Sequence, residues 1–235
     1  MKKFLSAVAI VVALNGPAHA QDWDKGLDAY QAGDYATALQ EWRPLAEQGD
    51  ADAQNGLGSM YANGQGVLQD YAEAEKWFRL SAEQGDAGAQ SNLGSMYYNG
   101  NGIPQDHAEA VKWYRLAAEQ GDAPAQANLG YMYQNGYGVL QDYAEAVKWY
   151  RLAAEQGNAP AQSNLGLMYQ NGYGVPEDHV VAHMWFNIAS FNGNEKAPEL
   201  RDSIARDMTT QDISTAQAMA RECMSSNYQN CGYWG

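Results

Sequence analysis

The sequence predicts an all-α protein built as an α-solenoid of helix–turn–helix repeats. The same 36-residue unit occurs four times, and its second and third copies differ at only eight positions. Each copy carries two apolar runs at helical spacing, separated by turns that contain glycine. One helix pair cannot bury its apolar stripe alone, so successive pairs are expected to stack into a continuous core. The four units are 46–81, 82–117, 118–153 and 154–189.

The first helix of each unit is expected over 51–63 in the first copy. Leu57 and Met60 lie three residues apart, on the helical face shared by the constant apolar residues. Asp50 can cap the start of this helix, and Gly64 can take the left-handed conformation that ends one. Glycine also recurs in mid-helix, where it costs about 1 kcal/mol against alanine, so close helix–helix approach is expected there. These glycines are Gly58, Gly94, Gly130 and Gly166.

The second helix of each unit begins at an Asp-x-x-Glu pattern, which is Asp70 and Glu73 in the first copy. This spacing resembles a capping box, with the aspartate satisfying backbone N–H groups that lack a helical partner. Gly85 follows the helix and is expected to end it. The expected packing residues are Ala74, Trp77, Phe78 and Leu80.

The two ends of the chain depart from the repeat, as the terminal units of a solenoid do. Residues 21–45 predict an N-terminal capping unit with a shorter loop. Residues 190–235 predict a C-terminal helical cap and tail, with one helix over 195–206 and another over about 211–224, capped by a threonine.

Residues 1–20 predict a signal peptide. Lys2 and Lys3 form its positive start, 4–14 is an unbroken apolar run, and Ala18-His19-Ala20 is a small-x-small cleavage site. The apolar run is about half the roughly 20 residues that a membrane-spanning helix needs, although a retained anchor is the alternative. The pattern is typical of bacterial export, so the mature chain is expected to be periplasmic or secreted, without membrane insertion.

The chain contains two cysteines, Cys223 and Cys231, both near the C-terminus. In an exported chain a disulfide between them is the first interpretation. A metal site is the second, but no histidine lies near them in the sequence, and a free reactive pair is the third.

The chain is strongly acidic, with a formal net charge of −14. Removal of 1–20 takes away two lysines and no acid, and so leaves −16. Such a field repels phosphate backbones and anionic lipids, which makes nucleic acid and membrane surfaces poor partners. It favours a neutral or basic partner and a soluble protein, which we expect to be a monomer.

The repeat resembles the Sel1-like repeat, a family within the tetratricopeptide-like solenoids. Its two halves read Ala-x-Ala-Gln-x-x-Leu-Gly-x-Met-Tyr-x-x-Gly-x-Gly-Val and Asp-Tyr-x-x-Ala-x-x-Trp-Tyr-x-x-Ala-Ala-x-x-Gly, best seen at 123–157. The N-terminal unit is closer to the plain tetratricopeptide form. The resemblance implies an adaptor in protein complexes. A cysteine-rich branch of the family is associated with penicillin binding and β-lactam hydrolysis, but the repeats of this chain contain no cysteine, so that activity is not carried over.

The sequence shows no signature of a catalytic site. It contains neither Gly-x-Ser-x-Gly nor Ser-x-x-Lys, and no phosphate-binding P-loop. The Gly-x-Gly turns follow helix C-termini, whereas phosphate binds at helix N-termini. His179 and His183 lie one helical turn apart, but they lack the glutamate of a zinc protease motif and His179 occupies an ordinary repeat position. We expect no cofactor, no metal and no enzyme activity.

Comparison of the four copies yields a candidate protein-binding surface. The positions of the first helix that change between copies are three or four residues apart and share one face. The resemblance implies that this face lines a concave groove. Tyrosine and amide side chains suit protein recognition, although the alternative is that these positions vary because nothing constrains them. The candidate residues are Ser95, Tyr98, Tyr131, Gln134, Tyr137, Leu167, Gln170 and Tyr173.

The sequence therefore predicts an exported repeat scaffold that binds a protein or peptide partner. One alternative is an envelope hydrolase acting on cell-wall or β-lactam substrates. Another is a secreted factor that binds host protein.

Overall fold

The computed structural model describes residues 22–228 and Cys231, so the predicted signal peptide, 1–20, lies outside the described residues. Over this range the chain forms α-helices, one 3-10 helix and no strand, which confirms the all-α class. The elements are α1 (Trp23–Gln31), α2 (Tyr35–Glu47), α3 (Ala51–Asn63), α4 (Tyr71–Glu83), α5 (Ala87–Asn99), α6 (His107–Glu119), α7 (Ala123–Asn135), α8 (Tyr143–Ala154), α9 (Ala159–Asn171), α10 (His179–Phe191), α11 (Ala197–Ile204), η1 (Ala205–Asp207) and α12 (Thr210–Ser225).

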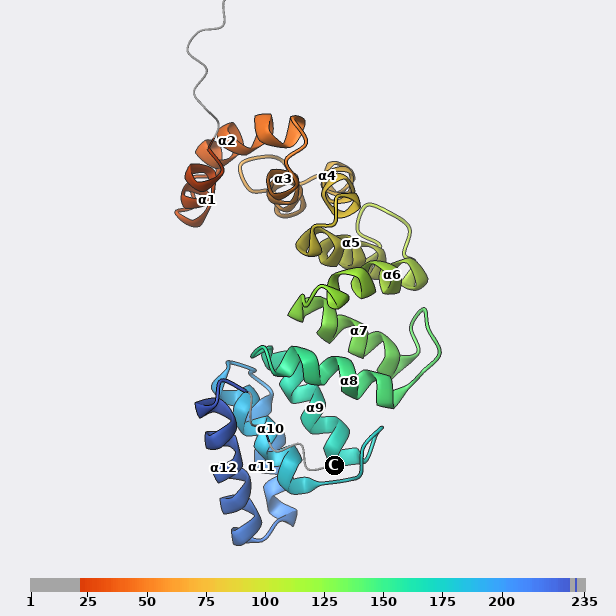
Figure 1. The fold of residues 1–235 in the computed structure, drawn as a ribbon, viewed down its shortest axis with the longest axis vertical. Helices are drawn as coiled ribbons and strands as arrows, with labels where there is room; N and C mark the ends of the chain where they lie inside the picture. Colours follow the sequence, from red (N-terminus) through yellow and green to blue (C-terminus); the bar gives the residue numbers. More distant parts are fainter. Residues whose placement is uncertain (1–21, 229–230, 232–235) are drawn as a thin grey trace, which may run out of the picture.

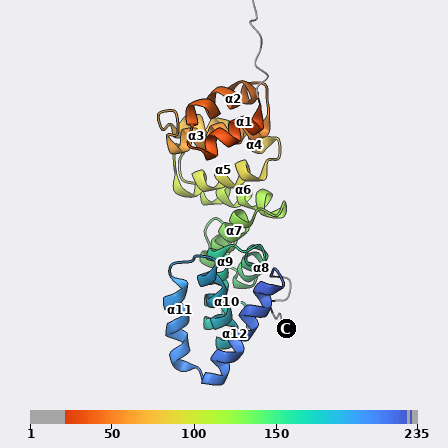
Figure 2. The same cartoon turned by 90° about the vertical axis from the view of Figure 1, so that its left-hand side faces the viewer.

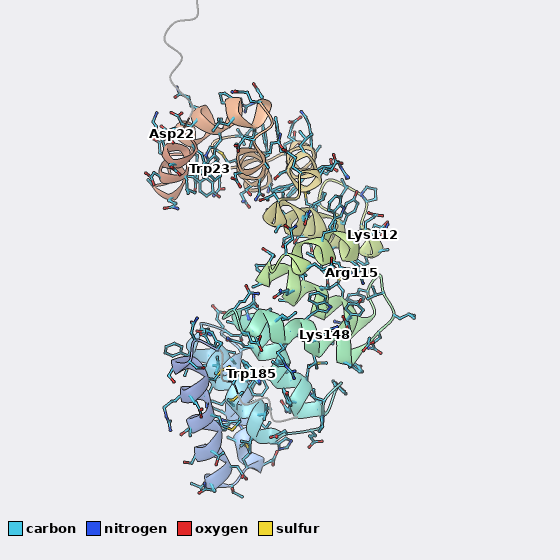
Figure 3. The ribbon with its side chains drawn as sticks, viewed as in Figure 1. Asp22, Trp23, Lys112, Arg115, Lys148 and Trp185 are labelled. Carbon is cyan, nitrogen blue, oxygen red and sulfur yellow. A yellow bond between two sulfur atoms is a disulfide. The ribbon has the colours of Figure 1, made fainter. Side chains whose placement is uncertain are left out.

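The helices pack in chain order into a curved stack, as predicted for an α-solenoid (Figure 1). The N-terminal pair α1 and α2 forms one end of the arc, and α11 and α12 form the other. In the N-terminal half, α1, α3 and α5 lie nearer the inside of the arc than α2, α4 and α6. At the N-terminal end, the ring of Trp23 on α1 stacks on the buried Trp42, with ring centroids 4.9 Å apart (Figure 3).

The first helix of each unit begins and ends where the sequence predicts. The Asp50 carboxylate accepts a hydrogen bond from the Ala53 backbone N–H at 2.8 Å. At the other end, Gly64 adopts φ +67°, a left-handed conformation that strains residues with a side chain. The same arrangement bounds α5, α7 and α9, with an asparagine, Asn158, as the cap of the last.

The capping box predicted for the second helices is only half formed. Asp70 accepts hydrogen bonds from the backbone N–H groups of Ala72 and Glu73, at 2.9 and 3.2 Å. The reciprocal bond is missing because the Asp70 backbone N–H already donates to the carbonyl of Tyr61 at 3.0 Å. The Glu73 carboxylate instead pairs with Lys76, three residues on. A complete box forms at α12, between Thr209 and Asp212.

Mid-helix glycines mark close contact between the two helices of a unit, as predicted. A Cβ atom on Gly58 would lie 2.7 Å from Cδ1 of Phe78, closer than real Cβ contacts allow. The aromatic ring of the second helix therefore fills the space that a side chain would need. The equivalent pairs are Gly94 with Tyr114, Gly130 with Tyr150, and Gly166 with Phe186.

One predicted core residue is wrong, because Leu80 is 40% exposed. At about 100° per residue, Leu80 lies well away from the direction that Ala74 and Phe78 share on α4. Ser81 points into the stack instead and is fully buried, with its hydroxyl donating to the Ala51 carbonyl at 2.8 Å. The equivalent residues Leu116 and Leu152 are exposed as well.

A buried glutamine joins the two helices of each unit to one another and to the preceding helix, a role that the sequence pattern did not reveal. The Gln54 side chain donates to the carbonyl of Ala46 at 3.0 Å and accepts from Nε2 of Gln84 at 2.7 Å. Both polar atoms of a buried amide are thereby satisfied. The equivalent buried residues are Gln90, Gln126 and Gln162, whose partners are Gln120, Gln156 and Asn192.

The C-terminal cap begins as a further unit and then departs from the repeat. The Asn194 side chain accepts from the Ala197 backbone N–H at 3.0 Å, as Asn158 does 36 residues earlier, so α11 keeps the register of a first helix. By contrast, α12 turns back onto α10 and packs on Met184, Trp185 and Ile188. Figure 2 shows α10 between α11 and α12. The predicted disulfide joins Cys223 of α12 to Cys231.

Among the described residues, no helix is both long and apolar enough to span a membrane.

Candidate protein-binding surface

We call the eight candidate residues named above the stripe. The structure distributes them over α5, α7 and α9 and the turns that follow α7 and α9. Near the N-terminal end of the stripe, Ser59 and Ala62 of α3 and Ser95 of α5 line one open pocket of about 220 Å³. The helices α3 and α5, which carry these residues, lie toward the inside of the arc (Figure 1).

Three stripe tyrosines meet in an aromatic cluster, formed by Tyr98, His107, Tyr131 and Tyr137. The ring of Tyr98 lies 6.3 Å from that of Tyr131 and 6.4 Å from that of Tyr137, between centroids. His107, which the sequence analysis left out of the site, completes the cluster at 5.3 Å from Tyr98 and 5.1 Å from Tyr137. Tyr131 and Tyr137 remain 39% and 37% exposed, so the cluster is packed yet partly open to solvent.

The turn of each unit reaches back onto the second helix of the preceding unit. Gly138, at φ +68°, approaches the carbonyl oxygen of His107 so closely that a Cβ would lie only 2.2 Å away. This contact sets the neighbouring Tyr137 against the His107 ring. One unit later, Tyr173 stacks on Tyr143 in the same way, with centroids 4.8 Å apart and an interplanar angle of 11°.

Two polar stripe residues bind buried tyrosines of their own unit. The Tyr114 hydroxyl donates to Oγ of Ser95 at 3.1 Å, and the Tyr150 hydroxyl donates to Oε1 of Gln134 at 2.6 Å. Burial raises the pKa of Tyr114 to about 12 and also raises the pKa of Tyr150, so both phenols are neutral donors. Ser95 and Gln134 thus support the fold as well as lining the stripe.

The last two helical residues of the stripe lie in a different environment. Leu167 packs on the cluster that Ala182 and Phe186 form with Ile204 of α11. Within the described residues, Oε1 of Gln170 is buried without a hydrogen-bond partner. The reason is that Phe186 stands where Tyr150 stands in the preceding unit, and it carries no hydroxyl. The exposed part of the stripe is therefore formed by Tyr131 of α7 and by Tyr137 and Tyr173 of the turns that follow α7 and α9.

Arginine side chains of the second helices also link successive units, through hydrogen bonds to tyrosine. The Arg115 guanidinium donates to the Tyr133 hydroxyl at 2.6 Å, and each such bond joins a second helix to the next first helix. Lys112 and Arg115 lie on the outer side of the arc (Figure 3). The equivalent pairs are Arg43 with Tyr61, Arg79 with Tyr97, and Arg151 with Tyr169.

The two histidines considered as a metal pair have other surroundings. His183 is buried, and its Nδ1 lies 3.3 Å from the amide nitrogen of Asn187. Burial, followed by the neighbouring Arg201, lowers the pKa of His183. His179 lies 3.2 Å from the Glu177 carboxylate. In the part of the chain that the structure describes, no three His, Cys, Asp or Glu side chains gather into a group that could hold a metal ion.

The stacked helix pairs define a helical-repeat protein of the α-solenoid class. The sequence model of the Sel1 repeat matches 51–86, 87–122, 123–158 and 159–194, and the chain belongs to this family. These repeats have the predicted period and begin at the first residue of each first helix, five residues later than the units drawn from the sequence. Sel1 repeats generally mediate protein–protein interactions.

Solved structures of the family share the fold. A protective antigen of uropathogenic Escherichia coli, which displays this repeat fold, is 37% identical with a TM-score of 0.74 over 88% of this chain and 47% of that one. The chain therefore spans about half the length of that relative. A Sel1 repeat protein from Oxalobacter formigenes is 31% identical with a TM-score of 0.70, covering 86% of this chain and 100% of its own. No curated protein matches the chain.

Proposed function

We propose that the protein is an exported scaffold that binds a protein or peptide partner along the stripe, with the aromatic cluster at the centre of the contact. The observation that carries the proposal is the half-open cluster of Tyr98, Tyr131 and Tyr137. Rigid aromatic rings supply much contact area at low entropic cost, and interface hot spots are enriched in tyrosine. The cluster occurs where the units differ from one another, whereas the residues that build the stack stay constant.

The export part of the proposal rests on two features at opposite ends of the chain. Residues 1–20 have the charge and apolar pattern of a cleaved leader. The disulfide between Cys223 and Cys231 persists in an oxidising compartment and is rare in the bacterial cytosol. A binding role without catalysis fits the family, and the E. coli relative, a protective antigen, supports the secreted factor as the variant of this role to test first.

The experiment exchanges cluster residues for those that other units of the same chain carry at the same positions. Tyr98→Gln, Tyr131→Ser and Tyr137→Asn copy Gln134, Ser95 and Asn101 respectively, so the fold tolerates each residue type. The control is Leu140→Pro, which copies Pro104 of the equivalent turn one unit earlier. Leu140 is exposed and outside the cluster.

The mature wild type, the triple variant and the control are cross-linked in envelope extract and in culture medium, and the partner captured by the wild type is quantified. The triple variant should lose that partner at an unchanged thermal midpoint, while the control retains it. If a folded triple variant captures the partner as well as the wild type does, the partner does not bind through the stripe. Turnover of a chromogenic β-lactam by the purified wild type would favour the hydrolase instead.

A further inference from the structure

The last three α-helices form a pocket that lies apart from the stripe. Because α12 packs on α10 and turns away from α11, an open space of about 330 Å³ remains between them. Phe191 of α10 lies at this pocket, together with Arg201 of α11 and with Arg221 and Met224 of α12. Figure 2 shows α11 and α12 on either side of α10.

Two of the lining residues break the pattern of the repeat. Arg201 stands 36 residues after Leu165 in the register that α11 keeps, at a position that is a fully buried leucine in the four preceding units. Phe191 occupies the place of a surface glutamate and is 75% exposed. The last unit thus carries arginine where the regular units have a core leucine, and phenylalanine where they have a surface glutamate. The equivalent residues of the regular units are the leucines Leu57, Leu93, Leu129 and Leu165 and the glutamates Glu83, Glu119 and Glu155.

The pocket is cationic in an acidic protein. The chain carries 28 Asp and Glu against 14 Lys and Arg, yet no carboxylate side chain lines this space. Arg201 is held in position, because Nε and Nη2 both donate to the Asp202 carboxylate, at 2.8 and 2.7 Å, and Nη1 donates to Oδ1 of Asn187 at 3.5 Å. Arg221 makes no hydrogen bond or ion pair within the part of the chain described. One guanidinium is therefore fixed and the other is available.

We propose that this pocket binds the C-terminal carboxylate of a partner polypeptide that ends in a bulky apolar residue. A planar guanidinium binds a carboxylate through two parallel hydrogen bonds, which Arg221 is free to form. The apolar side chain of the terminal residue packs on Phe191 and Met224, next to the charge. An anion without an apolar group would leave Phe191 uncovered, so the two features select one ligand class.

The test uses a defined probe, the peptide acetyl-Gly-Ser-Gly-Ser-Leu-Phe with a free C-terminal carboxylate, and the same peptide as a C-terminal amide. Binding is followed on the full mature chain by NMR, through the methyl resonance of Met224 and the Nε–Hε resonance of Arg221. The carboxylate peptide should shift both resonances saturably, and the amide should bind at least about tenfold more weakly. Added salt should lower the affinity of the pocket for the carboxylate peptide, since part of that affinity is electrostatic.

Variants identify the groups responsible. Arg221→Gln should remove the preference for the carboxylate, and Phe191→Glu, which restores the residue of the regular units, should abolish binding. Arg206→Gln is the matched control, because Arg206 is exposed on η1 and does not line the pocket. Tyr131→Ser, in the stripe, should bind the probe normally. Absence of saturation, equal binding of acid and amide, or unchanged binding by Arg221→Gln would each overturn the proposal without touching the proposed function.

Discussion

The unpartnered Oε1 atom of Gln170 leads to a quantitative prediction about Phe186. In the preceding unit, the Tyr150 hydroxyl donates to Oε1 of Gln134 at 2.6 Å. Phe186 packs on Gly166 much as Tyr150 packs on Gly130, so Phe186→Tyr places a hydroxyl near Oε1 of Gln170. Leaving a buried acceptor unpaired costs about 1–3 kcal/mol, and a new hydrogen bond contributes about 1 kcal/mol net.

We therefore expect Phe186→Tyr to stabilise the protein by about 1 kcal/mol, which corresponds to a rise of about 2–4 °C in thermal midpoint for a chain of this size. Urea denaturation followed by circular dichroism measures the difference. The reciprocal change, Tyr150→Phe, should destabilise by about 1–2 kcal/mol, because it leaves Oε1 of Gln134 unpaired. The reasoning fails if Phe186→Tyr lowers the midpoint or leaves it unchanged while Tyr150→Phe is costly.

Three further changes test the packing of the stack by the same measurements. Gln126→Leu removes the acceptor of Gln156 Nε2, which donates at 2.8 Å, and should cost about 2–3 kcal/mol in urea denaturation; a loss below about 0.5 kcal/mol would show that the ladder contributes little. Gly130→Ala would put a Cβ 2.8 Å from Tyr150 and should cost about 1–3 kcal/mol, so an unchanged midpoint would show that the ring can move. The pKa of His183 is lowered in the folded protein, so as pH falls through about 6.5 the His183 side chain is protonated in the unfolded chain before it is protonated in the folded one. The contribution of the neutral His183 to the free energy of unfolding is therefore present above that pH and is lost below it. Replacement by His183→Gln should flatten the fall in thermal midpoint between about pH 7.5 and 5.5, and an identical pH profile would contradict this assignment.

Local chemistry made much of the fold predictable. Helix bounds followed from Asp50 and Gly64, because caps and left-handed turns depend on a few neighbouring residues. The capping box failed at Glu73 because a carbonyl in the preceding helix had already taken the backbone N–H of Asp70. Leu80 was misplaced because it was assigned to the core by its hydrophobicity, although at about 100° per residue it lies away from the face that Ala74 and Phe78 share.

The candidate site was predictable only in part, because one member of the aromatic cluster belongs to it through a contact with the next unit. Variation between copies pointed to Tyr98, Tyr131 and Tyr137, which the structure brings together. It gave no sign of His107, because that residue joins the cluster through the next unit's turn, 30 positions along the chain. A signal in the sequence could have identified it, because the two contacting positions change together between copies. They are Tyr71 and Asn101 in one unit pair, and His107 and Tyr137 in the next.

The glutamine ladder has a direction. Gln54 donates to the carbonyl of Ala46, and Gln90 donates to that of Ala82, so each helix pair makes these bonds with the helix synthesised just before it. Gly138 likewise rests on His107, which precedes it in the chain. A polypeptide that emerges N-terminus first, whether from a ribosome or from an export channel, can thus pack each new helix pair against a pair that has already folded. The next pair then covers the apolar face that remains open, and the disulfide between Cys223 and Cys231 closes the series last.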